Sequence, residues 1–249
     1  MKTEFIDGFT IPENMRVYAI GDVHGYHAHL VKLHEFIEDD IAHYPIEKSM
    51  IVYLGDYVNR GPDSSQVVDT LIQYKENPNI ETRFLLGNHE NGVIEFLKDP
   101  EGKNRSWYAW PDEAFLKSYE INPELYEPYK LAEQMQKVIP KKHIEFMETC
   151  QLYELVGDFL FVHSGMRPGV SLDSQDRADL FNTREPFMSC EERLEYYVVH
   201  GHTSTDDFKV DKRMNRMNLD TGLFKGGPLS CGVFESNTVR LIDVKYDQV

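Results

Sequence analysis

The sequence predicts an α/β fold in which two β-sheets pack face to face and helices cover their outer sides. Three observations lead to this prediction. Strand and helix patterns alternate over the first hundred residues, helical patterns occupy residues 98–149, and paired apolar runs with turn residues between them follow. Alternating strands and helices are typical of a mostly parallel sheet with right-handed crossovers, whereas apolar runs joined by short turns are typical of hairpins.

The N-terminal half contains three units of strand, loop and helix, in a βαβαβ pattern. Short apolar runs predict strands at residues 17–20, 50–54 and 84–86. Apolar residues recur at helical spacing after Gly25, and a second helix is expected to begin with Ser64 as its N-cap. A third helix is expected after Glu90. In such sheets ligands bind beyond the carboxyl ends of the strands, which is where the polar motifs of this chain lie.

Residues 98–149 differ in composition from the preceding segment. We interpret them as a helical cap inserted into a single domain of residues 1–249. The stretch 98–105 is polar, and prolines at positions 123, 128 and 140 punctuate the expected helices. Pro140 suits a first helical position, where its missing N–H costs no hydrogen bond. Trp107 and Trp110 are interpreted as core side chains rather than as a platform for substrate.

The remainder of the chain is rich in β patterns. Residues 152–163 and 232–244 each contain two apolar runs separated by two turn residues, Gly157-Asp158 and Ser236-Asn237. This arrangement predicts two hairpins. Added to the N-terminal strands, they lead us to expect the second sheet and a β-rich C-terminal half.

Charge and composition limit the partners and the location. Among the 249 residues there are 26 basic and 42 acidic side chains, for a net charge of -16. Such a chain repels nucleic acid, and it can bind an anionic substrate only where cations reverse the local potential. The three cysteines have no CxxC spacing and are expected to be reduced. Without an apolar leader or a run long enough to span a bilayer, the expected location is the cytoplasm, away from membranes.

Five apolar runs end in a turn that carries a carboxylate, an amide or an imidazole. The side chains concerned are Asp22, His24, Asp56, Asn88, His163 and His202. Each turn alone would more often be ordinary turn chemistry. Because all five fall where a strand ends, we expect the side chains to converge at one edge of the sheet.

These side chains form a mixed oxygen and nitrogen ligand set. Asp22 and His24 lie two residues apart and can chelate one cation, whereas Asp56 can bridge two. The set suits Mn, Fe, Zn or Co better than Ca or Mg, and no cysteine lies in any motif. Two cations with a shared carboxylate would lower the pKa of a bridging water and clamp two phosphoryl oxygens.

Three further side chains fit phosphate chemistry. Arg60 and Arg184 would bind phosphoryl oxygens through the forked guanidinium, and His89 would protonate the leaving oxygen. His200 is an alternative metal ligand to His202. The position of His202 in the Gly-His-Thr loop favours His202. The remaining histidines are interpreted as surface or core groups: His27, His29, His34, His43 and His143.

The motifs GDVHG, GDYVNRG, GNHE, FVHSG and HGHT, in this order, resemble those of the metallo-dependent phosphoprotein phosphatases of the calcineurin-like metallophosphoesterase superfamily. The resemblance runs from Tyr18 to about Val244, and the stretch after residue 157 is similar to the bacterial serine/threonine phosphatases. It implies a four-layer α-β-β-α metallophosphoesterase sandwich formed by one catalytic domain.

The same resemblance implies residue roles. Asp22, His24 and Asp56 would hold a first metal, and a second would be held by Asp56, Asn88, His163 and His202. Arg60 and Arg184 would bind the phosphate, and His89 would be the general acid. The metals would be two divalent transition-metal ions, with manganese preferred and iron, zinc or cobalt as alternatives. Phosphate transfer to water would be direct, by attack of the metal-bridging hydroxide.

Two positions depart from the family pattern. Asn59 stands where GDYVDRG has its second aspartate, which in the family pairs with the histidine of GNHE. Asn59 can form a hydrogen bond but supplies no charge, so His89 should be harder to protonate and catalysis attenuated. In the cap, Ala109-Trp110-Pro111-Asp112 replaces a Gly-Gly that often follows the tryptophan in bacterial relatives.

Three functions are consistent with these observations. The first, which is the leading interpretation, is a metal-dependent phosphatase that hydrolyses phosphoserine or phosphothreonine in a phosphoprotein or phosphopeptide. The second is a dinucleoside polyphosphate hydrolase of the diadenosine tetraphosphate type, which uses similar motifs. The third is a catalytically weak pseudo-phosphatase that binds phosphoprotein, for which Asn59 is the sole argument. The sequence does not assign an oligomeric state.

Overall fold

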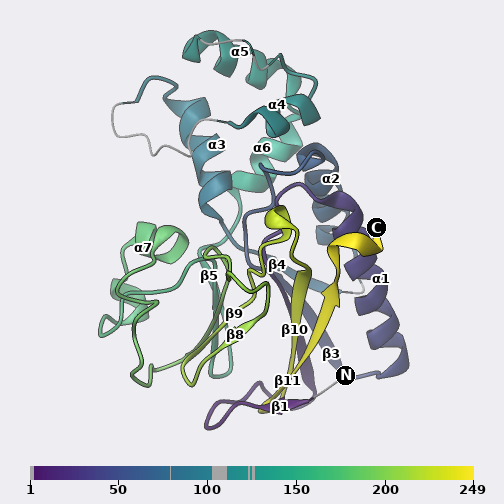
Figure 1. Ribbon diagram of the computed structural model, residues 1–249, viewed down its shortest axis with the longest axis vertical. Helices are drawn as coiled ribbons and strands as arrows, with labels where there is room; N and C mark the ends of the chain where they lie inside the picture. The colour runs from purple at the N-terminus through teal and green to yellow at the C-terminus, as the bar shows by residue number, and fades with distance from the viewer. Residues whose placement is uncertain (1–2, 79, 103–110, 123, 125–126) are drawn as a thin grey trace.

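Two β-sheets face each other in the computed structural model, which describes residues 3–78, 80–102, 111–122, 124 and 127–249 (Figure 1). The larger sheet has the order β1-β11-β10-β2-β3-β4. Its strands are β1 (Glu4–Phe5), β11 (Thr238–Val244), β10 (Leu229–Glu235), β2 (Met15–Ile20), β3 (Lys48–Tyr53) and β4 (Glu81–Phe84). Strands β2, β3 and β4 are parallel, and the other pairs are antiparallel. The prediction of a mostly parallel sheet is therefore wrong, because the hairpin β10–β11 extends this sheet beside β2.

The smaller sheet has the order β5-β6-β7-β9-β8. Its strands are β5 (Tyr153–Val156), β6 (Phe159–Val162), β7 (Tyr197–His200), β9 (Arg216–Asn218) and β8 (Asp211–Lys212). The predicted hairpin of residues 152–163 is confirmed as the antiparallel pair β5–β6. Strand β7 is parallel to β6 and to β9.

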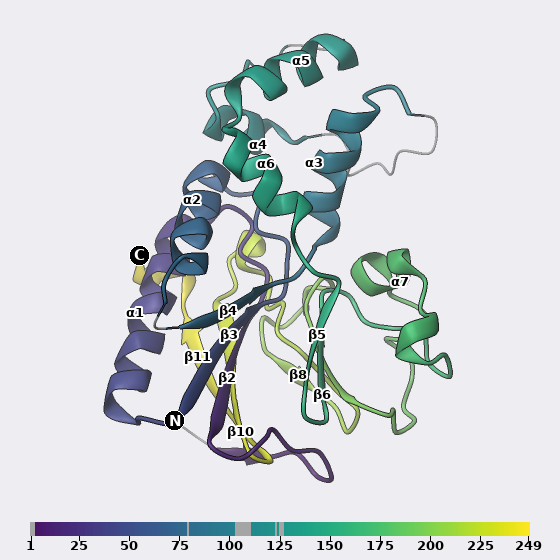
Figure 2. The same ribbon diagram turned by 180° about the vertical axis from the view of Figure 1, so that it is seen from behind.

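Helices cover the outer sides of both sheets. Helices α1 (His27–His43) and α2 (Ser64–Lys75) lie on the larger sheet, and α7 (Arg177–Asn182) lies on the smaller one (Figures 1 and 2). Short 3₁₀ turns lie at Leu172–Ser174, Leu223–Lys225 and Tyr246–Gln248. The predicted sandwich with outer helices is confirmed.

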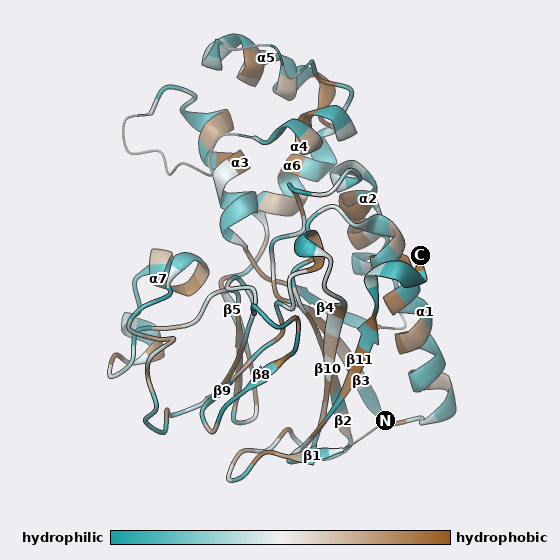
Figure 3. Cartoon of the chain, viewed as in Figure 1, coloured by the Kyte–Doolittle hydropathy of each residue, from teal (hydrophilic) through white to brown (hydrophobic). Residues whose placement is uncertain are grey.

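Three apolar cores separate the four layers, and alternation along the strands explains them. In β2, Val17 and Ala19 belong to the core between the sheets, whereas Tyr18 and Ile20 belong to the core under the helices. Strand β6 likewise divides its residues between the inter-sheet core and the core beneath α7. Because successive side chains of a strand point to opposite faces, a strand that is apolar throughout must be covered on both. Apolar segments follow strands β10 and β3 in Figure 3, while the helices carry apolar and polar segments together.

The segment predicted as a cap contains three helices, α4 (Glu113–Ser118), α5 (Pro128–Val138) and α6 (Lys141–Glu148). They gather beyond α3 (Asn88–Lys98) at one end of the sandwich (Figure 1). Buried side chains of all three helices, such as Phe115, Leu131 and Phe146, belong to the same apolar cluster as α1 and α2. The cap therefore packs on the sandwich through a continuous core. The predicted core residues Trp107 and Trp110 lie outside the described residues.

Three helix boundaries differ from those expected. Asp63, and not Ser64, is the N-cap of α2. Pro140 is the N-cap of α6 and not its first residue. Helix α3 begins at Asn88, so the residues of GNHE form its first turn instead of preceding it. The last difference matters for the site, because it places the three polar motif residues Asn88, His89 and Glu90 in the first turn of a helix, where backbone N–H groups have no partner within the helix.

The described residues form no disulfide and no membrane-spanning helix. Cys150, Cys190 and Cys231 are all free thiols. Within the described ranges, no helix has the length and apolar character needed to cross a bilayer.

Candidate metal centre

The predicted ligands converge at the end of the sandwich nearest the cap, but they come from two sheets rather than from one sheet edge. Asp22, Asp56 and Asn88 follow β2, β3 and β4 of the larger sheet, while His163 and His202 follow β6 and β7 of the smaller one. All are at least nine-tenths buried. A pocket of about 300 Å³ opens beside them and is lined by His24, Asp56, Arg60, Asn88, His89, Arg184, His202, Thr203, Ser204, Asp220, Phe224 and Lys225.

Asp56 lies at the centre, with its two carboxylate oxygens directed at different imidazoles. Its Oδ1 is 3.4 Å from Nε2 of His163, and its Oδ2 is 3.7 Å from Nε2 of His24 and 4.0 Å from Nε2 of His89. The imidazole and carboxylate ligand atoms form two overlapping groups, each within 4.8 Å: His24, Asp56 and His89, and Asp56, His163 and His202. Asp56 belongs to both groups, which is the arrangement that a bridging carboxylate requires.

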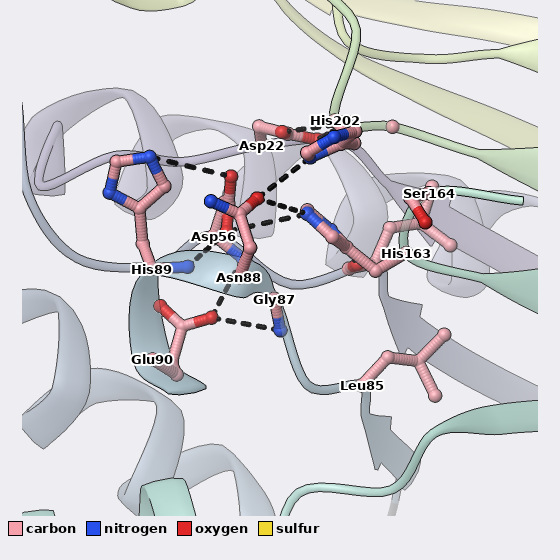
Figure 4. A network of polar contacts seen from close by, with 12 residues as sticks. Asp22, Asp56, Leu85, Gly87, Asn88, His89, Glu90, His163, Ser164 and His202 are labelled. Atoms are coloured by element: carbon pink, nitrogen blue, oxygen red, sulfur yellow. Dashed lines mark hydrogen bonds and ion pairs between the residues drawn. The ribbon is translucent and has the colours of Figure 1, made fainter. Parts of the chain in front are cut away.

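Asn88 completes the second group. Its Oδ1 lies 2.7 Å from Nδ1 of His202 and 3.2 Å from Nε2 of His163 (Figure 4). In this view the side chains of Asp56, Asn88, His163 and His202 point toward one another, Asn88 from the start of α3 and the other three from loops that follow strands. The donor atoms that the sequence assigns to the second metal are thus brought together, and their role as ligands stays a prediction.

The first group differs from the sequence assignment. Asp22 was expected to join His24 and Asp56, but the third member within 4.8 Å is His89. The Asp22 carboxylate instead accepts the backbone N–H of His202, at 3.0 and 3.3 Å. It lies so close to Gly201 that a Cβ there would stand 2.0 Å from Oδ1, so only glycine fits. Asp22 thereby joins the two sheets, and its role as a ligand stays a prediction.

In two imidazoles a backbone carbonyl accepts a hydrogen bond from Nδ1, which fixes a proton on that nitrogen. The second nitrogen, Nε2, then faces side-chain oxygens. Nδ1 of His163 donates to the carbonyl of Leu54 at 2.8 Å, and Nδ1 of His24 donates to that of Val58 at 3.1 Å. Burial lowers the pKa of His24, so its ring is neutral and Nε2 presents a lone pair to Oδ2 of Asp56. In His163 burial is outweighed by the negative charge of Asp56, which raises the pKa, and Nε2 faces Oδ1 of Asp56 and Oδ1 of Asn88. Acceptors that face one another need a positive centre between them. Second hydrogen bonds of this type are what metal-ligating histidines usually make.

The electrostatics of the site favour cations as well. Burial, followed by the charges of Asp220 and Asp56, raises the pKa of Asp22 well above its usual range. Burial likewise raises the pKa of Asp220 to about 6. Burial also lowers the pKa of His202 to about 2, so this ring is neutral, and its Nε2 has no hydrogen-bond partner among the described residues. Crowded buried carboxylates and neutral imidazoles fit divalent metal ions, whose positive charge relieves the repulsion.

Backbone strain is concentrated around the same pocket. Of the nine described non-glycine residues with positive φ, five lie in the site: His24, Asp56, Asn59, Arg60 and His202. Such conformations cost of order 1 kcal/mol or more each and are retained where the surrounding structure fixes them. The strain is therefore localised where the ligand loops turn into the pocket.

His89, Asn59 and the two arginines lie around the ligand group. Nδ2 of Asn59 donates to Nδ1 of His89 at 2.8 Å, which leaves the ring proton on Nε2, toward Asp56. Burial lowers the pKa of His89 to about 4, although Asp56 opposes this shift. Arg60 and Arg184 are exposed and line the pocket. His200 does not line it; its ring packs at 5.1 Å against Phe187 in the smaller sheet's outer core.

Glu90 is a residue that the sequence reasoning missed. It is completely buried, and its carboxylate accepts the backbone N–H groups of Asp56 at 2.9 Å, Tyr57 at 2.8 Å, Val58 at 3.1 Å and Gly87 at 3.1 Å. Glu90 therefore fixes the loop that carries Asp56. The signal was present in the sequence, since a glutamate three residues after an N-cap is the pattern of a capping box.

Replacing Glu90 by glutamine should destabilise the protein and loosen the Asp56 loop. The glutamine amide would turn a donor toward N–H donors, which costs about 1–3 kcal/mol of unfolding free energy. Metal affinity should fall about 10- to 100-fold, as when outer hydrogen-bond partners of ligands are lost. Urea unfolding and metal titration measure the two effects. Glu95→Gln, an exposed position on the same helix, is the control, and equal behaviour of both variants would contradict the role given to Glu90.

With this geometry, the chain belongs to the calcineurin-like phosphoesterase family, whose model matches residues 15–224. It is 30% identical over 198 residues to a serine/threonine-protein phosphatase of Caenorhabditis elegans, a match that covers 77% of this chain and 36% of that protein. It is 25% identical over 237 residues to the asymmetrical bis(5'-nucleosyl)-tetraphosphatase PrpE of a Geobacillus strain, which covers 87% and 89% of the two chains.

The chain spans between 36% and 48% of the length of the first three curated relatives that it matches. Solved structures share the fold. A candidate diadenosine tetraphosphatase superposes with a TM-score of 0.63 at 21% identity, covering 93% of this chain and 98% of that one. A cold-active protein tyrosine phosphatase reaches 0.55 at 17% identity, covering 96% and 80%. At these identities the likeness concerns the fold alone.

Proposed function

We propose that this phosphoesterase cleaves a phosphoric anhydride in a dinucleoside polyphosphate. One observation supports the phosphoesterase chemistry. Two clusters of candidate metal ligands share Asp56, and the imidazoles of His24 and His163 face its carboxylate oxygens. The finer assignment is supported by the relatives that match the chain over nearly its whole length, which are named bis(5'-nucleosyl)-tetraphosphatases.

The roles of the residues follow from their places. Asp22, His24, Asp56, Asn88, His163 and His202 would hold two divalent transition-metal ions, which supply an activated water and polarise the phosphoryl group. Arg60 and Arg184 donate to the oxygens of the phosphoryl group at the mouth of the pocket. His89 would protonate the leaving oxygen through Nε2 as the imidazolium, a form that the donation of Asn59 Nδ2 to Nδ1 disfavours.

A phosphoserine or phosphothreonine phosphatase is the second candidate. It is supported by the 30% identity to the nematode serine/threonine-protein phosphatase. The exposure of Arg60 and Arg184 also suits a phosphate carried on a protein surface. A phosphoprotein-binding protein with little turnover is the remaining alternative, to which Asn59 alone points.

A comparison of substrates separates the three. The purified protein, loaded with manganese, is assayed with diadenosine tetraphosphate, a phosphothreonine peptide and an aryl phosphate. Our proposal expects kcat/KM to be highest for the dinucleotide. A higher value for the peptide would replace it by the second candidate. Tight peptide binding without turnover of any substrate would indicate the non-catalytic protein.

A further inference from the structure

We propose that Lys225, held by Ser204 and Phe224, forms a second anion subsite that binds the phosphoryl group next to the one being cleaved. The inference rests on the proposed function and deepens it, since it names the substrate class that the pocket prefers: molecules with two linked phosphoryl groups. None of these three residues was a sequence-predicted site residue, although all three line the metal pocket.

The turn that carries Lys225 is rigidly built. Gly222 and Gly226 flank it in left-handed conformations, with φ of 71° and 96°. Thr221 donates to the carbonyl of Pro228 at 2.7 Å, which closes the base of the turn, and a Cβ on Gly227 would stand 1.9 Å from the carbonyl oxygen of Thr221. Lys225 thus projects from a tight turn that has little freedom to rearrange.

Lys225 is also held at its charged end without a salt bridge to any residue that the structure describes, and the nearby Asp220 carboxylate interacts with it only at longer range. Its Nζ donates to Oγ of Ser204 at 2.5 Å. Among the described residues, no carboxylate lies within ion-pair distance of Lys225, Arg60 or Arg184, although the chain holds 42 acidic residues against 26 basic ones. Three unpaired cations around one pocket of a strongly acidic protein indicate an anionic ligand that pairs with all of them.

Phe224 links the additional cation to the predicted phosphate-binding arginine. The guanidinium of Arg60 lies 5.2 Å from the centre of its ring, and Nζ of Lys225 lies 5.3 Å from it. The same ring packs edge-on at 5.2 Å against His24, a predicted metal ligand. One aromatic side chain therefore sets the spacing of both cations relative to the metal group. Two arginines suffice for one phosphoryl group, so the separate lysine serves a neighbouring one.

The test compares inhibition by adenosine monophosphate and diphosphate, with hydrolysis of an aryl phosphate in excess manganese as the readout. Lys225→Met should raise the inhibition constant of the diphosphate about tenfold more than that of the monophosphate, because a single charge-assisted contact to the second phosphoryl group is lost. Lys225→Arg should retain most of the discrimination. Lys209→Met, an exposed lysine outside the pocket, is the control and should behave as the unchanged protein with both inhibitors.

Equal changes for both inhibitors, or no change, would overturn the subsite. Failure of the subsite and failure of the proposed function can be told apart. If the protein does not cleave diadenosine tetraphosphate, but Lys225→Met still weakens the diphosphate more than the monophosphate, then the subsite exists and the substrate is a different one. If aryl phosphate is not hydrolysed, calorimetric binding of the same two nucleotides gives the same comparison. Melting curves of each variant establish that the proteins compared are folded.

Discussion

Replacing Asp56 by asparagine is expected to lower kcat by on the order of 10³-fold and to reduce the bound metal below two ions per chain. Asp56 is the one side chain shared by both ligand groups, and its two oxygens face His163 on one side and His24 on the other. An amide keeps the shape but loses the charge and one acceptor, so it cannot bridge two cations. Elemental analysis and aryl phosphate hydrolysis measure the two effects.

The matched control is Asp39→Asn, an exposed aspartate on α1 that does not line the metal pocket. It should retain both metal content and rate. Full metal content together with a full rate in the Asp56 variant would show that the carboxylate is not a bridging ligand.

Replacing Asn59 by aspartate is expected to raise kcat about 10- to 100-fold in the metal-loaded protein. Asn59 already lies 2.8 Å from Nδ1 of His89, so the new carboxylate needs no rearrangement to accept a proton from that nitrogen. Asn and Asp both tolerate the left-handed backbone, with φ of 71°, at this position. The substitution therefore adds a charge beside the proton donor without altering the turn.

The pH dependence gives a second readout of this substitution. Burial holds the pKa of His89 at about 4, below the usual value for histidine. A general acid is active in its protonated form, so the rate is lost as the pH rises through this pKa. A nearby carboxylate favours the imidazolium and raises the pKa, so the high-pH limb of the Asn59→Asp profile should move to higher pH. Asn237→Asp, an exposed control, should leave the profile in place, and superimposable profiles for the unchanged protein and the Asn59→Asp variant would refute the pairing.

Local sequence patterns predicted most strands and helices of this fold, because buried positions are occupied by apolar residues. The apolar runs that become β2, β3 and β6 are apolar throughout, and each proves to be covered on both faces. The turn residues Gly157-Asp158 likewise marked the β5–β6 hairpin. The patterns did not predict which strands pair with one another in a sheet. Strand β10 joins the larger sheet beside β2 through packing between residues more than 200 positions apart.

The candidate site shows the same division. The ligand residues were found because five polar turns all fall at the ends of predicted strands, and the structure brings their side chains together. The capping-box spacing of Glu90 indicates its contact with Gly87, but its hydrogen bonds to the backbone N–H groups of the Asp56 loop leave no pattern in the sequence. Lys225 was missed because one exposed lysine resembles any other until the fold places it beside Ser204 and Phe224. The position of Asp22 depends on the contact between two sheets, which no local spacing encodes.

Asp112 connects the cap to the site, because its two carboxylate oxygens accept hydrogen bonds from different segments. Asp112 is the N-cap of α4, where Oδ1 accepts the N–H of Phe115 at 2.8 Å, and its Oδ2 accepts the N–H of Arg60 at 2.5 Å. The first helix of the cap therefore helps to position the backbone of Arg60, for which we propose phosphate binding. A cap from a relative could not be grafted onto this sandwich as an interchangeable module unless it brought a carboxylate to the same point. Divergence in the cap would then alter the rate of the chemistry along with the choice of substrate.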